Sequence, residues 1–292
     1  MEFTAGFEHF VRTDEPLAQY TWLKLGGSAE YFAEPTTIEE LASVVKRCRE
    51  NDIPCRVLGG GSNLLVSDDG VPGMVIHLSH PVFSGIEVDG NRVTVGGGAK
   101  LSHVVSTSVG AGLAGLEALA GIPGTVGGAL HGNAGANGVD IGQRTVEAKV
   151  MTRTGEVQTR TASDLQFTYR QSSLDELVIL SAVFELDPAD SQELTRRMQK
   201  FWIVQKASQP GGSDAVGYMF FDPQGLSASS VIEQSGLKGT KVGGAEICGE
   251  HANFVIASPE ATASDVRRLA ELVQSRVKEV SGMDLKCQLT IW

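Results

Sequence analysis

The sequence lacks the features of an exported or membrane-inserted chain. Its first residues, MEFTAGFEHFVRTDEP, contain no basic start followed by an apolar core, so no secretory signal is predicted. No apolar run approaches the roughly 20 residues that a membrane helix needs. We therefore expect a cytoplasmic protein without a membrane partner.

Positive charge is scarce as well. The chain has 24 lysines and arginines against 35 aspartates and glutamates, which gives a formal net charge of −11. Such a chain has no broad basic face that could neutralise a nucleic-acid backbone. Nucleic acid is therefore excluded as a partner, whereas a local basic pocket for a small phosphate-bearing ligand is not.

Cysteine is rare, and the common catalytic motifs are missing. The four cysteines are Cys48, Cys55, Cys248 and Cys287. They form no CxxC pair and have no histidine partner at zinc spacing, so we expect free thiols and no metal site. No HExxH motif, close carboxylate pair or Ser-His-Asp pattern stands out.

Glycine is the residue that the sequence has in excess, with 35 in 292 residues. The densest stretch is Gly115–Gly138, GLEALAGIPGTVGGALHGNAGANG, in which small residues leave no amphipathic pattern. Because glycine has no Cβ, its backbone can lie directly against a planar or phosphate-bearing ligand. A set of tight turns between strands is the alternative interpretation.

A second glycine-rich segment, Gly59–Asn63 (GGGSN), follows a short apolar strand predicted at Pro54–Leu58. Its backbone N–H groups and two polar side chains can form a concave nest that suits a pyrophosphate. The segment is neither GxGxxG nor a P-loop, since no lysine follows the glycines. A plain turn is again the alternative.

Hydrophobic periodicity predicts an α/β opening and mixed α and β content thereafter. The predicted helices are Thr37–Asn51 with Thr37 as N-cap, Leu101–Gly110, Gln192–Gln205, Ala228–Ser235 and Thr262–Ser281. The later predicted strands are Val75–Leu78, Ile86–Val88, Arg92–Val95, Ala148–Thr152, Val157–Arg160, Val178–Glu185, His251–Ile256 and Leu285–Trp292. We expect the three strands between 148 and 185 to belong to a mixed sheet.

Apolar spacing also predicts which helical side chains are buried. The expected core residues of the two long later helices are Leu194, Met198, Phe201 and Trp202, then Val266, Leu269, Leu272, Val273, Val277 and Val280. Between these helices, the polar connector Ala207–Gly217 marks the start of a C-terminal unit.

Arg170, within FTYRQSS, is the best charged candidate for a functional residue. A guanidinium among aromatic side chains can recognise a carboxylate or phosphate and can stabilise an oxygen on which charge develops. A surface salt bridge is the alternative. His251 precedes a predicted strand and could act as a base, although capping of the strand is the simpler interpretation.

The order of the motifs resembles the UDP-N-acetylenolpyruvoylglucosamine reductase family. The segments that carry the resemblance, from about Thr21 to Leu289, are LGGGSNLL, GLEALAGIPGTVGGALHGNAGANG, TYRQS, KASQP, GLKGTKVGGAEI and HANFVI. IPGTVGGA followed by NAGANG is highly specific. No insertion follows Arg170, so the chain is similar to the shorter form of the family.

The resemblance implies an α+β protein with a two-part FAD-binding unit of the vanillyl-alcohol-oxidase type (1–85 and 86–206) and a C-terminal α+β substrate domain (207–292). The implied cofactor is FAD, with NADPH as electron donor. The implied FAD-binding residues are Gly59, Gly60, Gly61, Ser62, Asn63, Ile122, Pro123, Gly124, Gly127, Gly128, Asn133, Gly135 and Gly138. The implied substrate is a UDP-sugar enolpyruvyl ether, an intermediate in peptidoglycan precursor synthesis, bound by Tyr169, Asp222, His251 and Asn253. A monomer is favoured.

The implied catalytic positions are Arg170, Tyr218 and Gln288. The family has serine or cysteine at the position of Tyr218, lysine at that of Phe221, asparagine at that of Asp222 and glutamate at that of Gln288. Of the residues that handle charge and protons, Arg170 alone matches. Two alternatives to the reductase therefore stay open: an FAD-binding paralogue without reductase chemistry, and a flavin oxidoreductase with another substrate.

Overall fold

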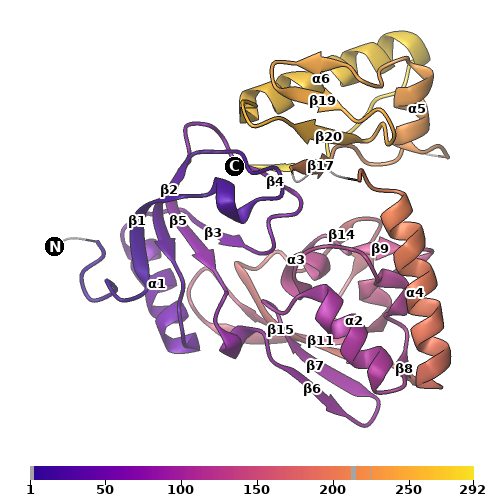
Figure 1. Ribbon diagram of the computed structural model, residues 1–292. Coiled ribbons are helices and arrows are strands. Elements are labelled where there is room, and N and C mark those ends of the chain that lie inside the picture. Colours follow the sequence, from indigo (N-terminus) through magenta and orange to yellow (C-terminus); the bar gives the residue numbers. More distant parts are fainter. Residues whose placement is uncertain (1–2, 212–214, 224) are drawn as a thin grey trace. The chain divides into compact units, whose positions relative to one another are not determined.

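The computed structural model describes residues 3–211, 215–223 and 225–292, so the connector predicted at Ala207–Gly217 lies partly outside the described residues (Figure 1). Two compact units make up the chain. Unit 1 comprises residues 1–13, 31–60 and 72–206, and unit 2 comprises 14–30, 61–71 and 207–292. Within the described residues, no helix is both long and apolar enough to cross a membrane.

A four-stranded sheet opens the fold, in the order β1-β2-β5-β3. Its strands are β1 (Val11–Pro16), β2 (Ser28–Ala33), β3 (Cys55–Leu58) and β5 (Val71–His77). β3 and β5 run parallel, with Val57 opposite Ile76. A parallel pair needs a long crossover, but the segment that connects β3 to β5 passes through unit 2 instead of forming a helix.

Helix α1 (Ile38–Glu50) confirms the predicted helix and its cap. Thr37 accepts a hydrogen bond from the backbone N–H of Glu40 at 3.1 Å, as an N-cap residue does. The Glu40 carboxylate accepts from the N–H of Thr36 at 2.7 Å, one residue before the cap. The apolar stripe at Leu41, Val44, Val45 and Cys48 is buried.

The larger sheet of unit 1 has five strands in the order β12-β11-β15-β7-β6. Its strands are β6 (Ile86–Asp89), β7 (Arg92–Gly96), β11 (Thr145–Met151), β12 (Val157–Thr161) and β15 (Val178–Glu185). Every neighbouring pair is antiparallel, so the prediction of a mixed sheet is wrong. The order joins strands that are distant in sequence, and local patterns carry no information about their direction.

Three helices accompany this sheet. They are α2 (Leu101–Gly110), α3 (Val126–His131) and α4 (Ser191–Ala207). Figure 1 shows α2 and α3 over one face of the sheet, where α3 contacts β7 and β15. In α4, Leu194 is buried, and Met198 and Phe201 pack against the core that includes Val93, Val150 and Phe184 of the five-stranded sheet, but Trp202 is 50% exposed. The prediction that Trp202 is a core residue is therefore wrong.

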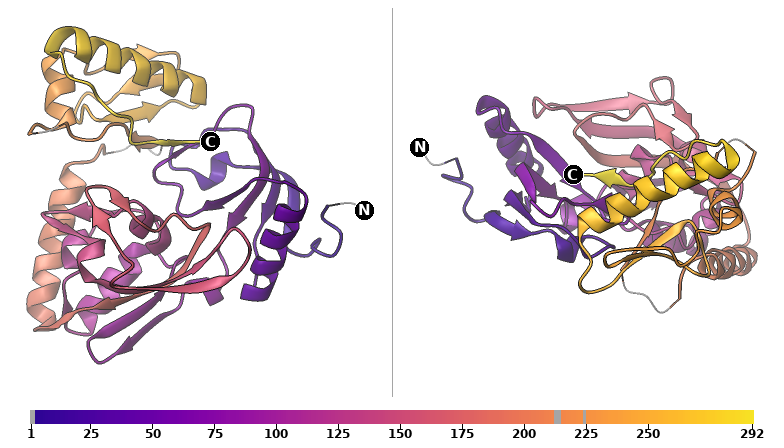
Figure 2. Two further views of the ribbon diagram at one scale, coloured as in Figure 1. Left: turned by 180° about the vertical axis from the view of Figure 1, so that it is seen from behind. Right: turned by 90° about the horizontal axis from the view of Figure 1, so that it is seen from above.

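Unit 2 contains a four-stranded antiparallel sheet in the order β17-β20-β19-β18. Its strands are β17 (Val216–Tyr218), β18 (Lys241–Val242), β19 (Ala245–Ile247) and β20 (Phe254–Ala257). Helices α5 (Ala228–Gln234) and α6 (Ala263–Ser281) pack together, and α6 lies along β18 and β19 (Figure 2). The strand predicted from His251 begins only at Phe254.

Helix α6 begins with a complete capping box, in which Thr262 and Asp265 satisfy each other's backbone N–H groups. Val266, Leu269, Val273 and Val277 of the predicted stripe are buried, and Leu272 is half-buried. Val280 is 65% exposed, so its predicted burial is wrong. The predicted final strand is also too long. Only β21 (Thr290–Ile291) is a strand, and it runs parallel to β4 (Leu64–Leu65).

Candidate functional site

Gly59 and Gly60 of one glycine-rich segment meet the other segment, Gly115–Gly138, in unit 1. A Cβ placed on Gly59 would lie 2.7 Å from the hydroxyl of Thr125, and one on Gly60 would lie 2.8 Å from Cα of Gly124. Real Cβ atoms do not approach that closely, so a side chain at Gly59 would have to displace the Thr125 hydroxyl and one at Gly60 would have to move the backbone of Gly124. Isolated turns do not need such contact between loops that are far apart in sequence.

A third glycine run, Gly96–Gly98, also contacts the glycine stretch, although it was not among the predicted site residues. The N–H of Gly127 donates to the carbonyl of Gly97 at 2.8 Å, and a Cβ on Gly97 would overlap the carbonyl oxygen of Ile179. Gly96 is the last residue of β7, and Gly97 and Gly98 follow it. The signal was therefore present as three consecutive glycines after a strand.

The later part of the glycine stretch is braced by Asn133. Its side chain accepts from the N–H of Gly142 at 3.1 Å and donates to the carbonyl of Thr168 at 2.8 Å. Asn133 is buried, so this amide holds neighbouring loops in place. Gly138 has φ of +80° with no atom near its missing Cβ, and it forms the turn between β9 (Gly135–Ala136) and β10 (Val139–Asp140).

Arg170 lies at the tip of a hairpin formed by β13 (Phe167–Thr168) and β14 (Gln171–Ser172). Its φ is +57°, which is uncommon for a residue with a side chain. The guanidinium carbon lies 5.7 Å from the centre of the Tyr169 ring. Its Nε is buried and has no hydrogen-bond partner among the residues that the structure describes. A buried donor without a partner is costly, and an anionic ligand atom would satisfy it.

The predicted residues of the C-terminal segment all belong to unit 2. Tyr218 in β17 pairs with Phe254 in β20, and their rings meet edge to face at 5.1 Å. The centres of the His251 and Phe254 rings lie 6.3 Å apart, and these two rings also meet edge to face. The three rings form an aromatic row along one end of the sheet, and Tyr218 supplies its hydroxyl-bearing member.

Three other predicted residues hold the backbone of unit 2. Asn253, 1% exposed, donates to the carbonyl of Phe220 at 2.8 Å and accepts from its N–H at 2.9 Å. Asp222 accepts from the N–H of Ala228 at the start of α5. Gln288 takes part through its main chain, donating to Met219 and accepting from Asn63 at 2.9 Å.

Comparison with known proteins finds a family match for an N-terminal and for a C-terminal part of the chain. Residues 29–161 match the FAD binding domain, and residues 209–292 match the C-terminal domain of UDP-N-acetylenolpyruvoylglucosamine reductase. A reductase of that name from Rhodopirellula baltica is 39% identical over 97% of this chain and 93% of its own length. The chain belongs to the UDP-N-acetylenolpyruvoylglucosamine reductase family.

Further relatives agree with this membership. A reductase from Paramagnetospirillum magneticum is 41% identical over 94% of this chain and 90% of its own length. The crystal structure of the Thermus caldophilus reductase aligns with a TM-score of 0.82 at 35% identity, covering 97% of this chain and all of its own. A grass-pollen glucose dehydrogenase, Phl p 4.0202, aligns over 65% of this chain and 45% of its own with a TM-score of 0.53 at 15% identity, a likeness of fold alone. The predicted fold class is confirmed, and the chain is a flavin oxidoreductase of this reductase's type.

Proposed function

We propose that the chain is an FAD-dependent reductase that uses NADPH to reduce the enolpyruvyl ether of UDP-N-acetylglucosamine in the cytoplasm. The observation that carries the proposal is the contact of Gly59 and Gly60 with Gly124 and Thr125, within a chain that matches its reductase relatives along nearly all of its length. We propose the domains implied by the resemblance, namely two FAD-binding subdomains at 1–85 and 86–206 and a substrate domain at 207–292. We also propose that the protein is a monomer.

The residues of unit 1 fit an FAD molecule in two ways. Gly59, Gly60 and Gly124 bring bare main chain together, and loops of this kind accept a pyrophosphate on their N–H groups. The buried Nε of Arg170 has no acceptor within residues 3–211, 215–223 and 225–292. We propose that Gly59–Asn63 hold the pyrophosphate, while Ile122–Gly128 and Asn133–Gly138 line the rest of the cofactor.

When bound, FAD supplies the transfer of hydride from NADPH to the enolpyruvyl double bond. The side chains then have to stabilise the negative charge that develops on the substrate and donate a proton to it. Arg170 is proposed to stabilise the negative charge that develops on the enolpyruvyl carboxylate. Tyr218 is proposed to donate the proton, because its hydroxyl occupies the position where the family carries serine or cysteine.

The substitutions implied by the resemblance should make this reaction slow. Gln288 keeps the shape of glutamate but cannot give up a proton, and Phe221 cannot contact a phosphate as lysine does. Loss of one general acid typically lowers the rate about 10²- to 10⁴-fold. We therefore propose a reductase with weak turnover and reduced affinity for its UDP-sugar.

Anaerobic stopped-flow measurement of the two half-reactions tests the proposal. Purified protein should be yellow and release FAD, NADPH should bleach the flavin, and UDP-N-acetylglucosamine enolpyruvate should restore the colour. A protein that remains colourless after incubation with FAD contradicts the whole proposal. Reduction by NADPH without reoxidation by the substrate contradicts the assigned reaction only.

The altered positions at Tyr218 and Gln288 favour a second candidate, an FAD-binding protein that has lost this reaction or acts on another substrate. A screen of enolpyruvyl ethers and alcohols for flavin bleaching or reoxidation separates these possibilities. Reoxidation by another compound supports a changed substrate. Failure of all compounds to react supports loss of the chemistry.

A further inference from the structure

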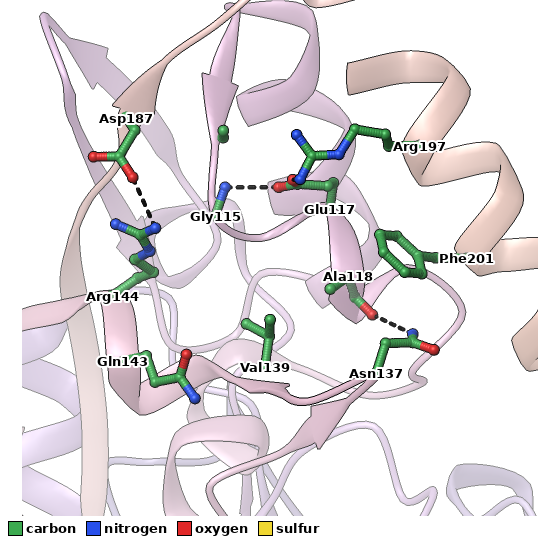
Figure 3. Close-up of a pocket in the computed structure, with 11 residues that line it drawn as sticks. Gly115, Glu117, Ala118, Asn137, Val139, Gln143, Arg144, Asp187, Arg197 and Phe201 are labelled. Carbon is green, nitrogen blue, oxygen red and sulfur yellow. Dashed lines mark hydrogen bonds and ion pairs between the residues drawn. The ribbon is translucent and has the colours of Figure 1, made fainter. Parts of the chain in front are cut away.

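A cavity of about 340 Å³ lies on one side of the glycine stretch, between its first residues and helix α4 (Figure 3). Two ion pairs line it. Arg197 of α4 meets Glu117 at 2.8 Å, and Arg144 meets Asp187 at 2.7 Å. Both pairs therefore border the same cavity.

The two carboxylates differ sharply in burial. The side chain of Glu117 is 5% exposed, whereas that of Asp187 is 67% exposed. A buried carboxylate is tolerated only when its oxygens are satisfied, and a water-exposed pair contributes little. Glu117 is the single carboxylate within Gly115–Gly138.

Both oxygens of Glu117 are occupied by groups that fix the main chain. One accepts from the N–H of Gly115 at 2.6 Å, and the other meets Arg197. Figure 3 shows the carboxylate between these two donors. The start of the stretch is thereby fastened to α4.

The same short segment is fixed at two further points. Asn137 donates to the carbonyl of Ala118 at 3.0 Å, from the far end of the stretch. A Cβ on Gly121 would lie 2.9 Å from the side chain of Gln205 on α4. The N–H of Ile122 then donates to Leu119 at 3.1 Å, which links the braced segment directly to the residues proposed to line the flavin.

We propose that Glu117, paired with Arg197, is a positioning residue for the flavin. It sets the backbone of Gly115–Gly121 and, through that segment, the backbone of Ile122–Gly128. The inference rests on the proposed function, because it needs FAD to lie against Ile122–Gly128. Glu117→Gln would leave one acceptor oxygen where there are two, so the side chain could not serve both the Arg197 guanidinium and the N–H of Gly115, and the ion pair would be lost.

The test compares Glu117→Gln with the matched control Asp187→Asn, which removes a carboxylate from the same cavity at its exposed pair. Glu117→Gln should weaken FAD binding at least tenfold in a fluorescence titration and should alter the visible circular dichroism of bound flavin. Asp187→Asn should change the affinity less than twofold. Equal effects of the two variants, or no effect of Glu117→Gln, would overturn the proposal.

A second readout does not need the cofactor. Hydrogen exchange of the FAD-free protein should show faster exchange at Gly115–Gly128 in Glu117→Gln and unchanged exchange in Asp187→Asn. Should Glu117→Gln not fold, Arg197→Met replaces it, because Arg197 is 48% exposed. Arg197→Lys keeps the charge and should restore the flavin signal, and its failure to do so counts against the ion pair.

The outcomes separate this inference from the proposed function. If the wild-type protein binds FAD and Glu117→Gln behaves as the wild type, the positioning role alone is lost. If the wild-type protein binds FAD but never reduces the UDP-sugar, the titration and the dichroism still decide the role of Glu117. If the wild-type protein binds no FAD, both are overturned.

Discussion

The two units place their predicted functional residues in opposite ways. In unit 1, a Cβ on Gly59 or Gly60 would collide with the loop at Gly124–Thr125, and one on Gly97 would collide with strand β15, so the main chain itself makes the contact. In unit 2, Tyr218 stands on β17 of a small antiparallel sheet and His251 lies just before β20, and the strands pair through their main chains.

This difference teaches where substitution is possible. Any side chain at Gly60 has to move the backbone of Gly124, because its Cβ would lie 2.8 Å from the Cα of Gly124. Gln288 instead contributes to the fold through its main-chain hydrogen bonds, so its side chain can change without loss of structure. A chain can therefore keep its cofactor loops while the groups that handle protons change.

The largest expected effect is a gain in turnover when positions 218 and 288 of unit 2 carry the residues implied by the family resemblance. The double substitution Tyr218→Ser with Gln288→Glu should raise turnover on UDP-N-acetylglucosamine enolpyruvate about 10²-fold or more, because under the proposed assignment it supplies a general acid at position 288. The measurement is the rate of flavin reoxidation in stopped flow. Tyr218→Phe is the control, since it keeps the ring and removes the hydroxyl. An unchanged rate in the double variant would mean that the substituted residues do not limit the reaction.

The next effect tests unit 1. Gly60→Ala places a methyl group 2.8 Å from Cα of Gly124, and overpacking of this kind costs about 1–3 kcal/mol. FAD affinity should fall roughly tenfold to hundredfold in an equilibrium titration. Gly85→Ala is the matched control, because its Cβ would meet no atom within 4 Å. Equal affinities in the two variants would contradict the close contact of the loops.

A third effect concerns the frame of unit 2. Asn253→Ala removes both bonds to the main chain of Phe220 and leaves a buried N–H and carbonyl unpaired. The free energy of unfolding should fall by about 2–3 kcal/mol in urea denaturation. Asn51→Ala, at an exposed position, should change it by less than about 0.5 kcal/mol. A small loss at Asn253 would show that unit 2 does not rely on this side chain.

The smallest effect lies in unit 1 but outside the cofactor loops. Hydrogen bonds from the backbone N–H of Thr36 and from His9 lower the pKa of Glu40 from 4.5 to about 2. Because the folded-state pKa is depressed, the stabilisation is present above pH 4.5 and is lost as the pH falls toward 2. Glu40→Gln should therefore lower the urea midpoint at pH 6 and have little effect near pH 2. Exposure keeps the change below about 1 kcal/mol. Glu39→Gln is the control, and equal behaviour of both variants at pH 6 would contradict the prediction.

Local sequence patterns predicted the helices well. The predicted bounds of α2, Leu101–Gly110, are those of the structure, and Thr37 caps α1 as predicted. Helix ends depend on a few neighbouring residues, so they can be read locally. The burial of Trp202 and Val280 could not be read in this way, because it depends on what each helix packs against.

The candidate site was predictable in composition but not in assembly. Gly59–Asn63 and Gly115–Gly138 stood out by their glycine content, and their motif order matched the family. Glu117 carried a visible signal as the single carboxylate of its stretch, yet nothing local named Arg197 as its partner. A partner on a distant helix is set by the packing of the whole unit.

The sequence by itself determined the helices, the glycine-rich segments and the family, because helix periodicity, missing side chains and motif order are written in neighbouring residues. Only the tertiary structure decided that Gly60 meets Gly124, that the five-stranded sheet is antiparallel and that Glu117 is buried against α4. These features depend on contacts between residues far apart in the chain, and such contacts form only when the chain folds.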